Sequence, residues 1–179
     1  RIANVVVNHF TNDSRVLKTS RSLNSLGFEC VVVAVHKKGL QEKEVVQGQR
    51  VRRIALWTKA WPRWRPIQFC KYFEFLVRAL IGCGDFDIIH CNDLNALPVG
   101  VLVKLFRKNK KVVYDCHEYE TEVNQLSRPG KAAMKWLEKR LIRHSDAVIT
   151  VSDSIANEYS RLYGISKPYL ILNCPHYRE

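Results

Sequence analysis

Lys110–Glu118, with the sequence KKVVYDCHE, is the stretch that indicates the fold most clearly. Two lysines precede the apolar run Val112 to Tyr114, which then gives way to polar residues. A short apolar run between helical patterns is typical of a strand in a parallel sheet that is covered on both faces. Ligands of such sheets bind beyond the carboxyl ends of the strands, where His117 and Glu118 are expected. The alternative is that His117 only caps the next helix or hydrogen-bonds to the backbone.

The same alternation of apolar runs and helical patterns continues along the whole chain. We expect strands at 2–7, 28–35, 51–56, 86–91, 146–151 and 169–172, and helices at 14–26, 67–81, 95–106, 131–144 and 153–162. The charged segment 37–49 is expected to be a connection. The pattern predicts an α/β fold with a Rossmann-like, doubly wound parallel sheet. Polar residues at 8–13, 92–93, 117–118 and 152–153 should then meet at one edge.

The composition is that of one globular domain with an excess of positive charge. Of its 179 residues, 46% are hydrophobic and 26% charged, and 29 Lys and Arg against 17 Asp and Glu give a net charge of +12. This excess favours an anionic partner: nucleic acid, an acidic membrane surface, or phosphorylated small molecules. No apolar run approaches the ~20 residues of a membrane span. We therefore expect a cytoplasmic domain that binds the inner membrane face only peripherally, if it binds a membrane.

Two further features bear on the setting of the domain. The six cysteines form no C-x-x-C pair, so we expect free thiols in a reducing cytosol. The chain begins at Arg1 without an initiator Met, and we expect it to be part of a longer protein.

The segment 57–66 and the helix after it combine aromatic and basic residues. Three tryptophans, two prolines and three basic residues lie in this segment, and the helix carries Phe69, Phe73, Leu76, Val77 and Leu80 at helical spacing. Such a surface is suited to a membrane interface. The alternative is that the stripe packs on the sheet and the tryptophans cover the core.

Five stretches, in this order, carry a resemblance to a known family: NDSRVLKTSRSLNSLGFECVVVA (12–34), DIIHCNDLNALPVG (87–100), KVVYDCHE (111–118), HSDAVITVSDSIANEYSRLYG (144–164) and ILNCP (171–175). They resemble the N-terminal domain of GT-B glycosyltransferases, and within these the retaining enzymes of glycosyltransferase family 4. The resemblance implies that residues 1–179 form the acceptor-side Rossmann-like half of a GT-B enzyme. The C-terminal domain, which binds most of the donor in the family, is not in this chain.

The reaction that the resemblance implies is transfer of a sugar, as by a hexosyltransferase, from a nucleotide sugar to an acceptor hydroxyl with retention. Its expected place is surface polysaccharide or glycolipid synthesis. The implied partners are the nucleotide sugar, a carbohydrate or lipid-linked acceptor, the C-terminal domain of the same protein, and an anionic membrane surface. No metal or other cofactor is expected, and the isolated domain is expected to be inactive.

The resemblance also implies roles for individual residues. His117 matches the histidine near the transferred sugar and the acceptor hydroxyl, where an imidazole can hold or relay a proton. Asp93, Glu118 and Ser152 are expected to contact substrate at the same edge. The loop 8–14 corresponds to the turn that approaches the donor phosphates.

That loop departs from the family in one respect. Phe10, Thr11 and Asn12 stand where the family has a glycine pair. Asn12, Asp13 and Arg15 are the residues expected to contact substrate there, and Arg15 supplies positive charge together with Lys18.

Other readings of the sequence stay open. His90, Cys91, Cys116 and His117 offer the ligand types of a zinc site, although neighbours on a strand point to opposite faces. Nucleic-acid binding would use the positive charge, but no RNA- or DNA-binding motif is present and we expect no nucleic acid partner. A GT-B type nucleotide-sugar epimerase and a non-catalytic sugar- or nucleotide-binding Rossmann domain are alternatives within the fold.

Overall fold

In the part of the chain that the structure describes, eight strands form one sheet with helices on both faces. The computed structural model describes residues 1–62, 64–116 and 128–173. Its strands are β1 (Ile2–Val5), β2 (Cys30–Val35), β3 (Lys43–Val46), β4 (Gln49–Ile54), β5 (Ile88–Asn92), β6 (Lys111–Cys116), β7 (Ala147–Thr150) and β8 (Tyr169–Leu170). Its α-helices are α1 (Ser14–Ser25), α2 (Arg65–Gly82), α3 (Asp93–Phe106), α4 (Arg128–Leu141) and α5 (Asp153–Tyr163), with 3-10 turns η1 (Trp57–Ala60) and η3 (Ile142–His144).

The strand order is β3-β4-β2-β1-β5-β6-β7-β8, and each described pair except β3–β4 is parallel. The order reverses at β1, which is the arrangement of a doubly wound sheet. Along the chain, each further strand after β5 is added on the far side of β1. The predicted α/β, Rossmann-like fold is confirmed.

One strand was not expected from the sequence. β3 lies inside the segment 37–49 that was predicted to be a connection, and it pairs antiparallel with β4 at the sheet edge. Gln47 and Gly48 join the two strands, and both have positive φ, at 48° and 82°. Two residues with positive φ make the tight hairpin turn that fits the twist of a sheet. Gln-Gly is a weak signal for such a turn, and β3 is a half-exposed strand without an apolar run.

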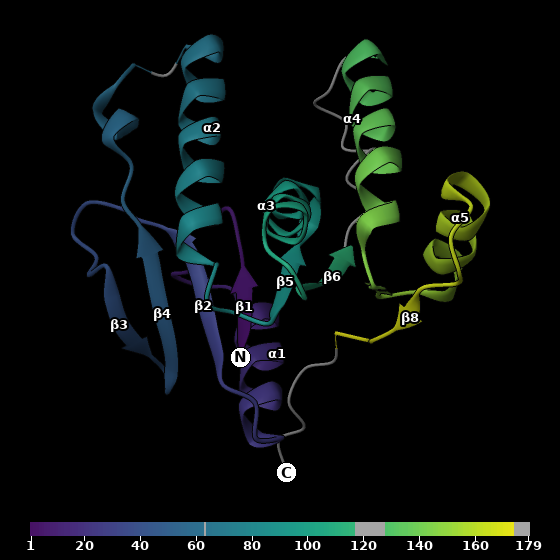
Figure 1. Cartoon of the computed structure of the whole chain (residues 1–179), viewed down its shortest axis with the longest axis horizontal. Coiled ribbons are helices and arrows are strands. Elements are labelled where there is room, and N and C mark those ends of the chain that lie inside the picture. The colour runs from purple at the N-terminus through teal and green to yellow at the C-terminus, as the bar shows by residue number, and fades with distance from the viewer. Residues whose placement is uncertain (63, 117–127, 174–179) are drawn as a thin grey trace.

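The two faces of the sheet have different covers, because side chains alternate along each strand. Figure 1 shows α2, α3 and α4 side by side on one face, with α1 on the other. Ala3 and Val5 of β1 face the helices α2 to α4 in the larger core, whereas Val32 and Ala34 of β2 pack against α1. The buried polar residues Asn4, His90, Asn92 and Asp115 alternate with core residues and lie on the α1 face.

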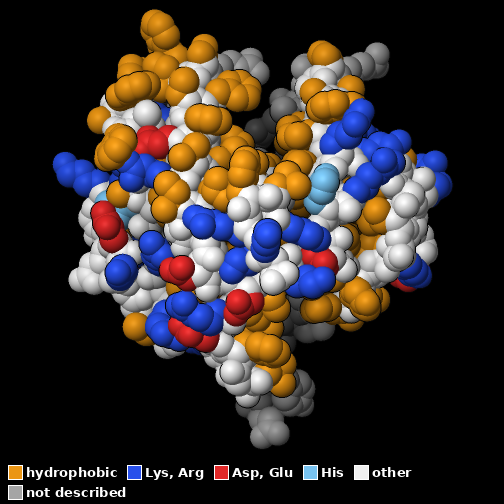
Figure 2. All heavy atoms as spheres, in the orientation of Figure 1, with side chains coloured by type: hydrophobic (Ala, Val, Ile, Leu, Met, Phe, Trp, Pro, Cys, Tyr) orange, Lys and Arg blue, Asp and Glu red, His pale blue; other side chains and the backbone are white. Residues whose placement is uncertain are grey.

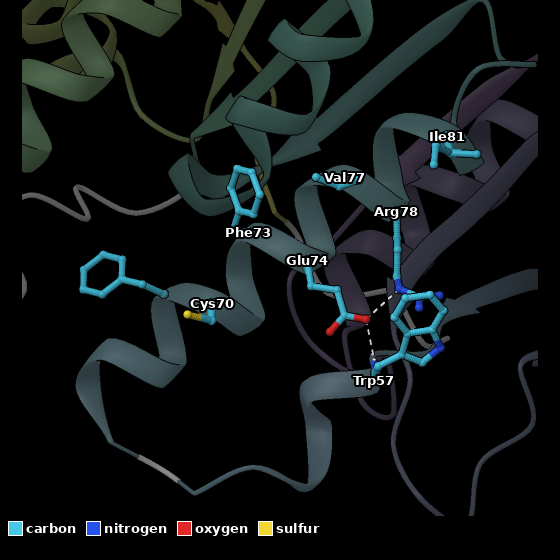
Figure 3. A pocket seen from close by; sticks show the side chains of 8 residues that line it. Trp57, Cys70, Phe73, Glu74, Val77, Arg78 and Ile81 are labelled. Carbon is cyan, nitrogen blue, oxygen red and sulfur yellow. Dashed lines mark hydrogen bonds and ion pairs between the residues drawn. The ribbon is translucent and has the colours of Figure 1, made fainter.

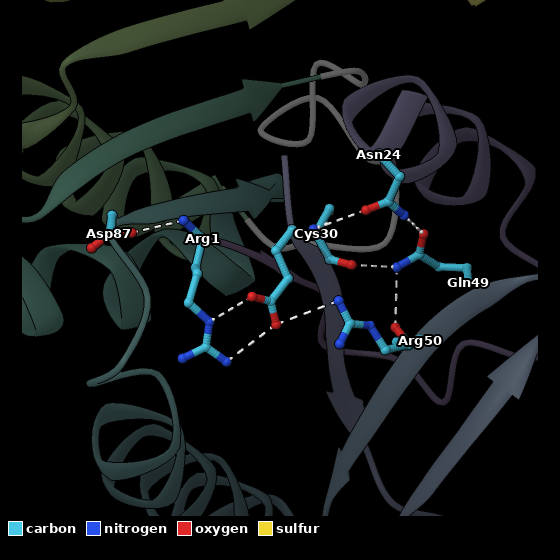
Figure 4. A network of polar contacts seen from close by, with 7 residues as sticks. Arg1, Asn24, Cys30, Gln49, Arg50 and Asp87 are labelled. Carbon is cyan, nitrogen blue, oxygen red and sulfur yellow. Dashed lines mark hydrogen bonds and ion pairs between the residues drawn. The ribbon is translucent and has the colours of Figure 1, made fainter. Parts of the chain in front are cut away.

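Polar contacts connect the elements at the amino-terminal edge of the sheet. The Gln49 amide donates to the Cys30 carbonyl oxygen at 2.7 Å and accepts from Asn24 Nδ2 at 2.6 Å (Figure 4). The Asn24 side chain also accepts from the Cys30 backbone N–H at 2.9 Å. These bonds tie the end of α1 to β2 and β4.

Three tyrosine hydroxyls meet the buried carboxylate of Glu138. Tyr114 and Tyr159 donate to Glu138 Oε1 at 2.7 Å each, and Tyr163 donates to Oε2 at 2.6 Å. Burial and the neighbouring Glu138 carboxylate raise the pKa of Tyr114. The cluster joins β6, α4 and α5 on the side of the sheet away from α1.

The described cysteines are free thiols, as predicted. Burial raises the pKa of Cys83 and of Cys116 to about 12, so neither thiol ionises near neutral pH. Cys174 lies outside the described residues.

Candidate functional site

The carboxyl ends of the strands meet at one edge, as the sequence predicted. β1, β5, β6 and β7 are parallel neighbours, so the residues after them lie in adjacent positions. Asn8 and Ser152 follow β1 and β7, and the Asn92–Asp93 pair joins the last residue of β5 to the first of α3. His117 and Glu118 come directly after Cys116, the last residue of β6, and lie outside the described residues.

The loop after β1 contains a residue with a left-handed backbone conformation, although the loop has no glycine. This conformation is costly for a residue that carries a side chain. Phe10 has a φ of 46°, a value that is an outlier for a bulky residue. Its ring is buried in the α1-side core, and its N–H donates to Asn8 Oδ1 at 2.8 Å. Buried Arg53 donates to the carbonyl oxygens of His9, at 2.9 Å, and of Phe10, at 3.3 Å. These contacts hold the loop and set the position of the His9 ring.

A cavity of about 620 Å³ opens beside this loop, between the ends of β1, β2 and β4, the turn η1 and helix α2. Its polar and basic lining residues are Asn8, His9, His36, Lys37, Lys59, Gln68, Lys71 and Tyr72. No described residue that lines it is acidic. We call it the basic cavity. Its volume lies in the range of about 300–1,000 Å³ that is usual for small-molecule sites.

Hydrogen bonds hold the ammonium groups of Lys59 and Lys71 in the basic cavity. The His36 Nε2 atom lies 2.9 Å from the Leu40 carbonyl oxygen, so it carries the proton and leaves Nδ1 as an acceptor. The Lys59 ammonium lies 3.4 Å from that Nδ1 atom. Burial and the like charge of Lys37 lower the pKa of Lys59. Lys71 donates to the carbonyl oxygens of Lys59, at 3.2 Å, and Trp61, at 2.8 Å.

Glu74 of α2 holds the turn that carries Lys59. Its carboxylate accepts from the backbone N–H of Trp57 at 2.7 Å, from that of Thr58 at 2.9 Å, and from Arg78 Nε at 2.7 Å (Figure 3). Burial alone would raise the pKa of Glu74, but hydrogen bonds from Thr58, Trp57 and Arg78 lower it to about 2. Glu74 therefore stays ionised, and its charge is neutralised by Arg78 rather than by the lysines of the cavity.

Two of the predicted substrate-binding residues cap helices. Asp13 is the N-cap of α1, where Oδ1 accepts from Val16 N at 3.2 Å and Oδ2 accepts from Asn8 Nδ2 at 3.0 Å. Ser152 is the N-cap of α5, and its hydroxyl accepts from Ile155 N at 3.3 Å. Both side chains lie at the carboxyl edge but do not line the basic cavity.

The other described candidates differ in their surroundings. Asn12 is exposed. Asp93 begins α3 directly after β5 with a φ of 65°, a conformation that Asp tolerates better than most residues and that is frequent at functional sites. Neither residue lines the basic cavity.

Arg15 faces away from the basic cavity, into the buried layer under α1. Its guanidinium lies 2.5 Å from Asp115 Oδ1, and His90 Nε2 lies 3.3 Å from Asp115 Oδ2. The Arg15 Nε atom is buried and has no hydrogen-bond acceptor among the described residues. The three side chains also line a separate cavity of about 270 Å³ between α1 and residues 171–173. The expected contact of Arg15 with substrate stays a prediction.

The zinc alternative finds no support among the described residues. No group of three or more His, Cys, Asp or Glu side chains is placed there to hold a metal. His90 lies with Asp115 on the α1 face, whereas Cys91 is in the core on the opposite face.

The outer face of α2 carries a second feature of this half of the molecule. Trp57, Phe69, Phe73, Val77 and Ile81 lie along a groove of about 670 Å³, with Arg78 stacked on the Trp57 ring at 4.0 Å. Phe69 is 75% exposed and Trp57 85%. The alternative that this stripe and the tryptophans cover the core is therefore wrong for the exposed residues. Phe75 and Ala79, on the other side of the helix, make the core contacts.

The sequence placed His9, within the polar segment 8–13, at this edge, but it did not single out the other histidine or the lysines of the basic cavity. These histidines and lysines come from the loop after β1, the loop after β2, η1 and α2. The available signal was the run His36 to Lys38 directly after the apolar strand β2. That run alone did not show that Lys59 and Lys71 face it.

Comparisons with known proteins agree with this architecture. The model of the family described as Glycosyltransferase Family 4 matches residues 14–174. Among solved structures, sucrose-phosphate synthase from Thermosynechococcus elongatus matches with a TM-score of 0.71 and 16% sequence identity. The match covers 96% of this chain and 47% of the synthase chain, so this chain spans about half the length of that protein. No curated protein matches.

Proposed function

Since the chain belongs to glycosyltransferase family 4, we propose that it is the N-terminal, acceptor-side half of a retaining glycosyltransferase. The complete enzyme transfers a hexosyl group from a nucleotide sugar to an acceptor hydroxyl, in the synthesis of a surface polysaccharide or glycolipid. The observation that carries the proposal is the basic cavity at the carboxyl edge of a doubly wound sheet, because ligands of this fold bind at that edge.

The roles follow from the position of each group. His117, next after β6, is proposed to hold or relay the proton of the acceptor hydroxyl, since imidazole exchanges protons near neutral pH. Asp93 and Ser152 begin α3 and α5 at the same edge and are proposed to orient the substrate. The proposal assigns no metal or other cofactor to the transfer.

The C-terminal domain of the same protein is proposed to bind most of the nucleotide sugar. Residues 1–179 would then supply the acceptor side and little affinity for the donor. An epimerase of the GT-B type, or a sugar- or nucleotide-binding domain without catalysis, is the alternative. These alternatives differ in one observable, because only a transferase passes the sugar to a second molecule.

We test the division of roles by assaying the isolated 179-residue chain beside the protein that also contains the C-terminal domain. Both are given a panel of UDP- and GDP-sugars and a cell extract as the source of acceptor. We expect sugar transfer from the larger protein and none from the isolated chain. Turnover by the isolated chain would contradict the assignment of donor binding to the other domain. Hydrolysis or epimerisation without transfer would favour the alternatives.

We also propose that the exposed stripe of α2 lies on an anionic membrane. Figure 2 shows hydrophobic side chains gathered over α2 and Lys and Arg side chains across the adjoining surface. The basic segment Arg107–Lys111 follows α3, and the Arg107 side chain reaches Gly84, just beyond the end of α2. Aromatic and basic residues together favour the headgroup region of anionic lipid. None of the described helices has the length and apolarity needed to cross a membrane.

The membrane contact predicts a specific loss in vesicle co-sedimentation. The double variant Phe69→Ser with Phe73→Ser should bind vesicles of anionic lipid at least about tenfold more weakly than wild type, because each exposed ring contributes roughly 1.5–3 kcal/mol when it is buried. Leu26→Ser, which changes a 72% exposed residue after α1, is the control and should bind as wild type does. Equal binding of neutral and anionic vesicles at low salt, or of the double variant and wild type, would refute the contact.

A further inference from the structure

We propose that the basic cavity binds a phosphate group of the acceptor, so that the acceptor is a phosphorylated sugar or a sugar linked through phosphate to a lipid. This inference rests on the proposed function, because it takes residues 1–179 to be the acceptor side. It adds the chemical class of the substrate and the residues that recognise it.

The wall of the basic cavity carries several positively charged side chains. Lys37, Lys59 and Lys71 line it together with His9 and His36, and no described lining residue is acidic. None of the three lysines pairs with a carboxylate among the described residues. A concave surface that carries several like charges without paired carboxylates attracts an anion.

Two acids of the neighbouring elements are already paired with other groups. Glu74 accepts hydrogen bonds from Arg78 and the η1 backbone. Glu44 pairs with Arg53, whose remaining donors hold the loop after β1. These two carboxylates are therefore engaged away from the cavity lysines, whose charge an incoming phosphate would neutralise.

One ammonium donor of the cavity is already held in position by the protein. The Lys59 ammonium is held near His36 Nδ1, and its turn is fixed to α2 through Glu74. The His9 Nδ1 atom lies 3.1 Å from the Val35 carbonyl oxygen and therefore carries the proton of the neutral ring, so Nε2 donates to a phosphate only in the imidazolium form. Donors fixed before the ligand arrives lose little freedom on binding, which favours affinity. A phosphate offers several strong acceptor oxygens to such donors.

Lys71 has a different role in this arrangement. Its ammonium donates to two carbonyl oxygens of the segment 59–61, so it positions η1. Lys37 and Lys59 are the residues that we assign to the phosphate. Gln68 and the Tyr72 ring complete the wall on the α2 side.

The test is a calorimetric titration of the full 179-residue chain with a hexose 6-phosphate, the same hexose without phosphate, and UDP. We expect the hexose phosphate to bind and the free hexose to bind at least about tenfold more weakly. Lys37→Gln and Lys59→Gln should each weaken the hexose phosphate by about tenfold, the usual loss for one charge-assisted hydrogen bond. Lys38→Gln is the control, because Lys38 is adjacent and exposed but does not line the cavity.

Three outcomes would overturn the inference. The first is equal binding of hexose and hexose phosphate, and the second is unchanged binding in both cavity variants. The third is that UDP binds and loses affinity in the same variants while the hexose phosphate does not bind, which would assign the cavity to the donor. A circular dichroism melt of each variant shows whether an affinity loss reflects unfolding.

A transfer assay of the protein with both domains separates this inference from the function on which it rests. Phosphatase treatment of a water-soluble acceptor fraction, or mild acid cleavage of the phosphate in a lipid fraction, should abolish transfer to that fraction, and the fraction that responds identifies the source of the phosphate. Transfer to phosphate-free acceptors only would overturn the inference and leave the transferase function intact. No transfer with any donor would overturn the function itself.

Discussion

Replacement of Glu138 by alanine is expected to destabilise the chain by about 3–5 kcal/mol. The Glu138 side chain is buried and accepts the hydroxyls of Tyr114, Tyr159 and Tyr163. Without the carboxylate, three buried hydroxyls lose their acceptor, and each such loss costs roughly 1–3 kcal/mol. The removed volume adds the cost of a cavity. Burying a carboxylate is itself unfavourable, but three short hydrogen bonds outweigh that penalty here.

The free energy of unfolding, measured in urea at pH 7, checks this expectation. Glu138→Gln is the matched control, because it keeps the volume and one carbonyl acceptor, and it should lose less than the alanine variant. Tyr163→Phe removes one of the three hydrogen bonds and should cost about 1 kcal/mol. An alanine variant within 1 kcal/mol of wild type would show that the cluster does not stabilise the junction of β6, α4 and α5.

Replacement of Asp115 by alanine should cost about 3–5 kcal/mol, because it leaves the Arg15 guanidinium buried without its partner. Arg15 is only 8% exposed, and water in the adjoining cavity offsets only part of the loss of a charged partner. The matched double variant, Arg15→Met with Asp115→Leu, removes both charges and should recover most of the loss. If Asp115→Ala were as stable as wild type, the buried Arg15–Asp115 pair would not stabilise the layer under α1.

The same pair predicts a dependence on pH. Burial alone would raise the pKa of Asp115, but His90 and Arg15 hold it below its usual value. A carboxyl group with a lowered pKa adds stability above its unfolded pKa of about 3.9, and this stability is lost as the pH falls through the folded value. Wild type should therefore lose more stability between pH 5 and 2 than Asp115→Ala does. The urea concentration at the midpoint of unfolding, measured for both proteins across this pH range, gives the difference. An equal fall of this midpoint with pH in wild type and in Asp115→Ala would contradict the expectation.

Local sequence predicted the parts of the fold that depend on local signals. The buried strands β1, β2, β5 and β6 are apolar runs, and Asp13 and Ser152 are strong helix caps. β3 was missed because its hairpin uses Gln47 and Gly48 rather than a strong turn pair. Helix α2 has apolar residues on two sides, with Phe75 in the core and Phe69 exposed. Helical periodicity alone does not reveal which of these sides packs on the sheet.

The site was predictable only as an edge of the sheet. Parallel strands place Asn92, Asp93 and Ser152 at a common edge once the fold is known. Which side chains meet there depends on tertiary contacts: Arg15 and Asp115 are 100 residues apart, and Lys59 reaches His36 through the placement of η1 by Glu74. The backbone of Phe10 could not be predicted from the sequence either. Phenylalanine disfavours the left-handed conformation, which the contacts with Arg53 and the core impose.

The measurement that tests the central claim most directly is sugar transfer by the protein with both domains, compared between wild type and His117→Ala. Loss of a proton-transferring group typically costs about 10²- to 10⁴-fold in rate. We predict transfer from one nucleotide sugar of the UDP and GDP panel and a fall of at least about 100-fold in the folded variant. Transfer that is absent with every donor, or undiminished in His117→Ala, would contradict the account of this edge of the sheet as the acceptor side of a glycosyltransferase.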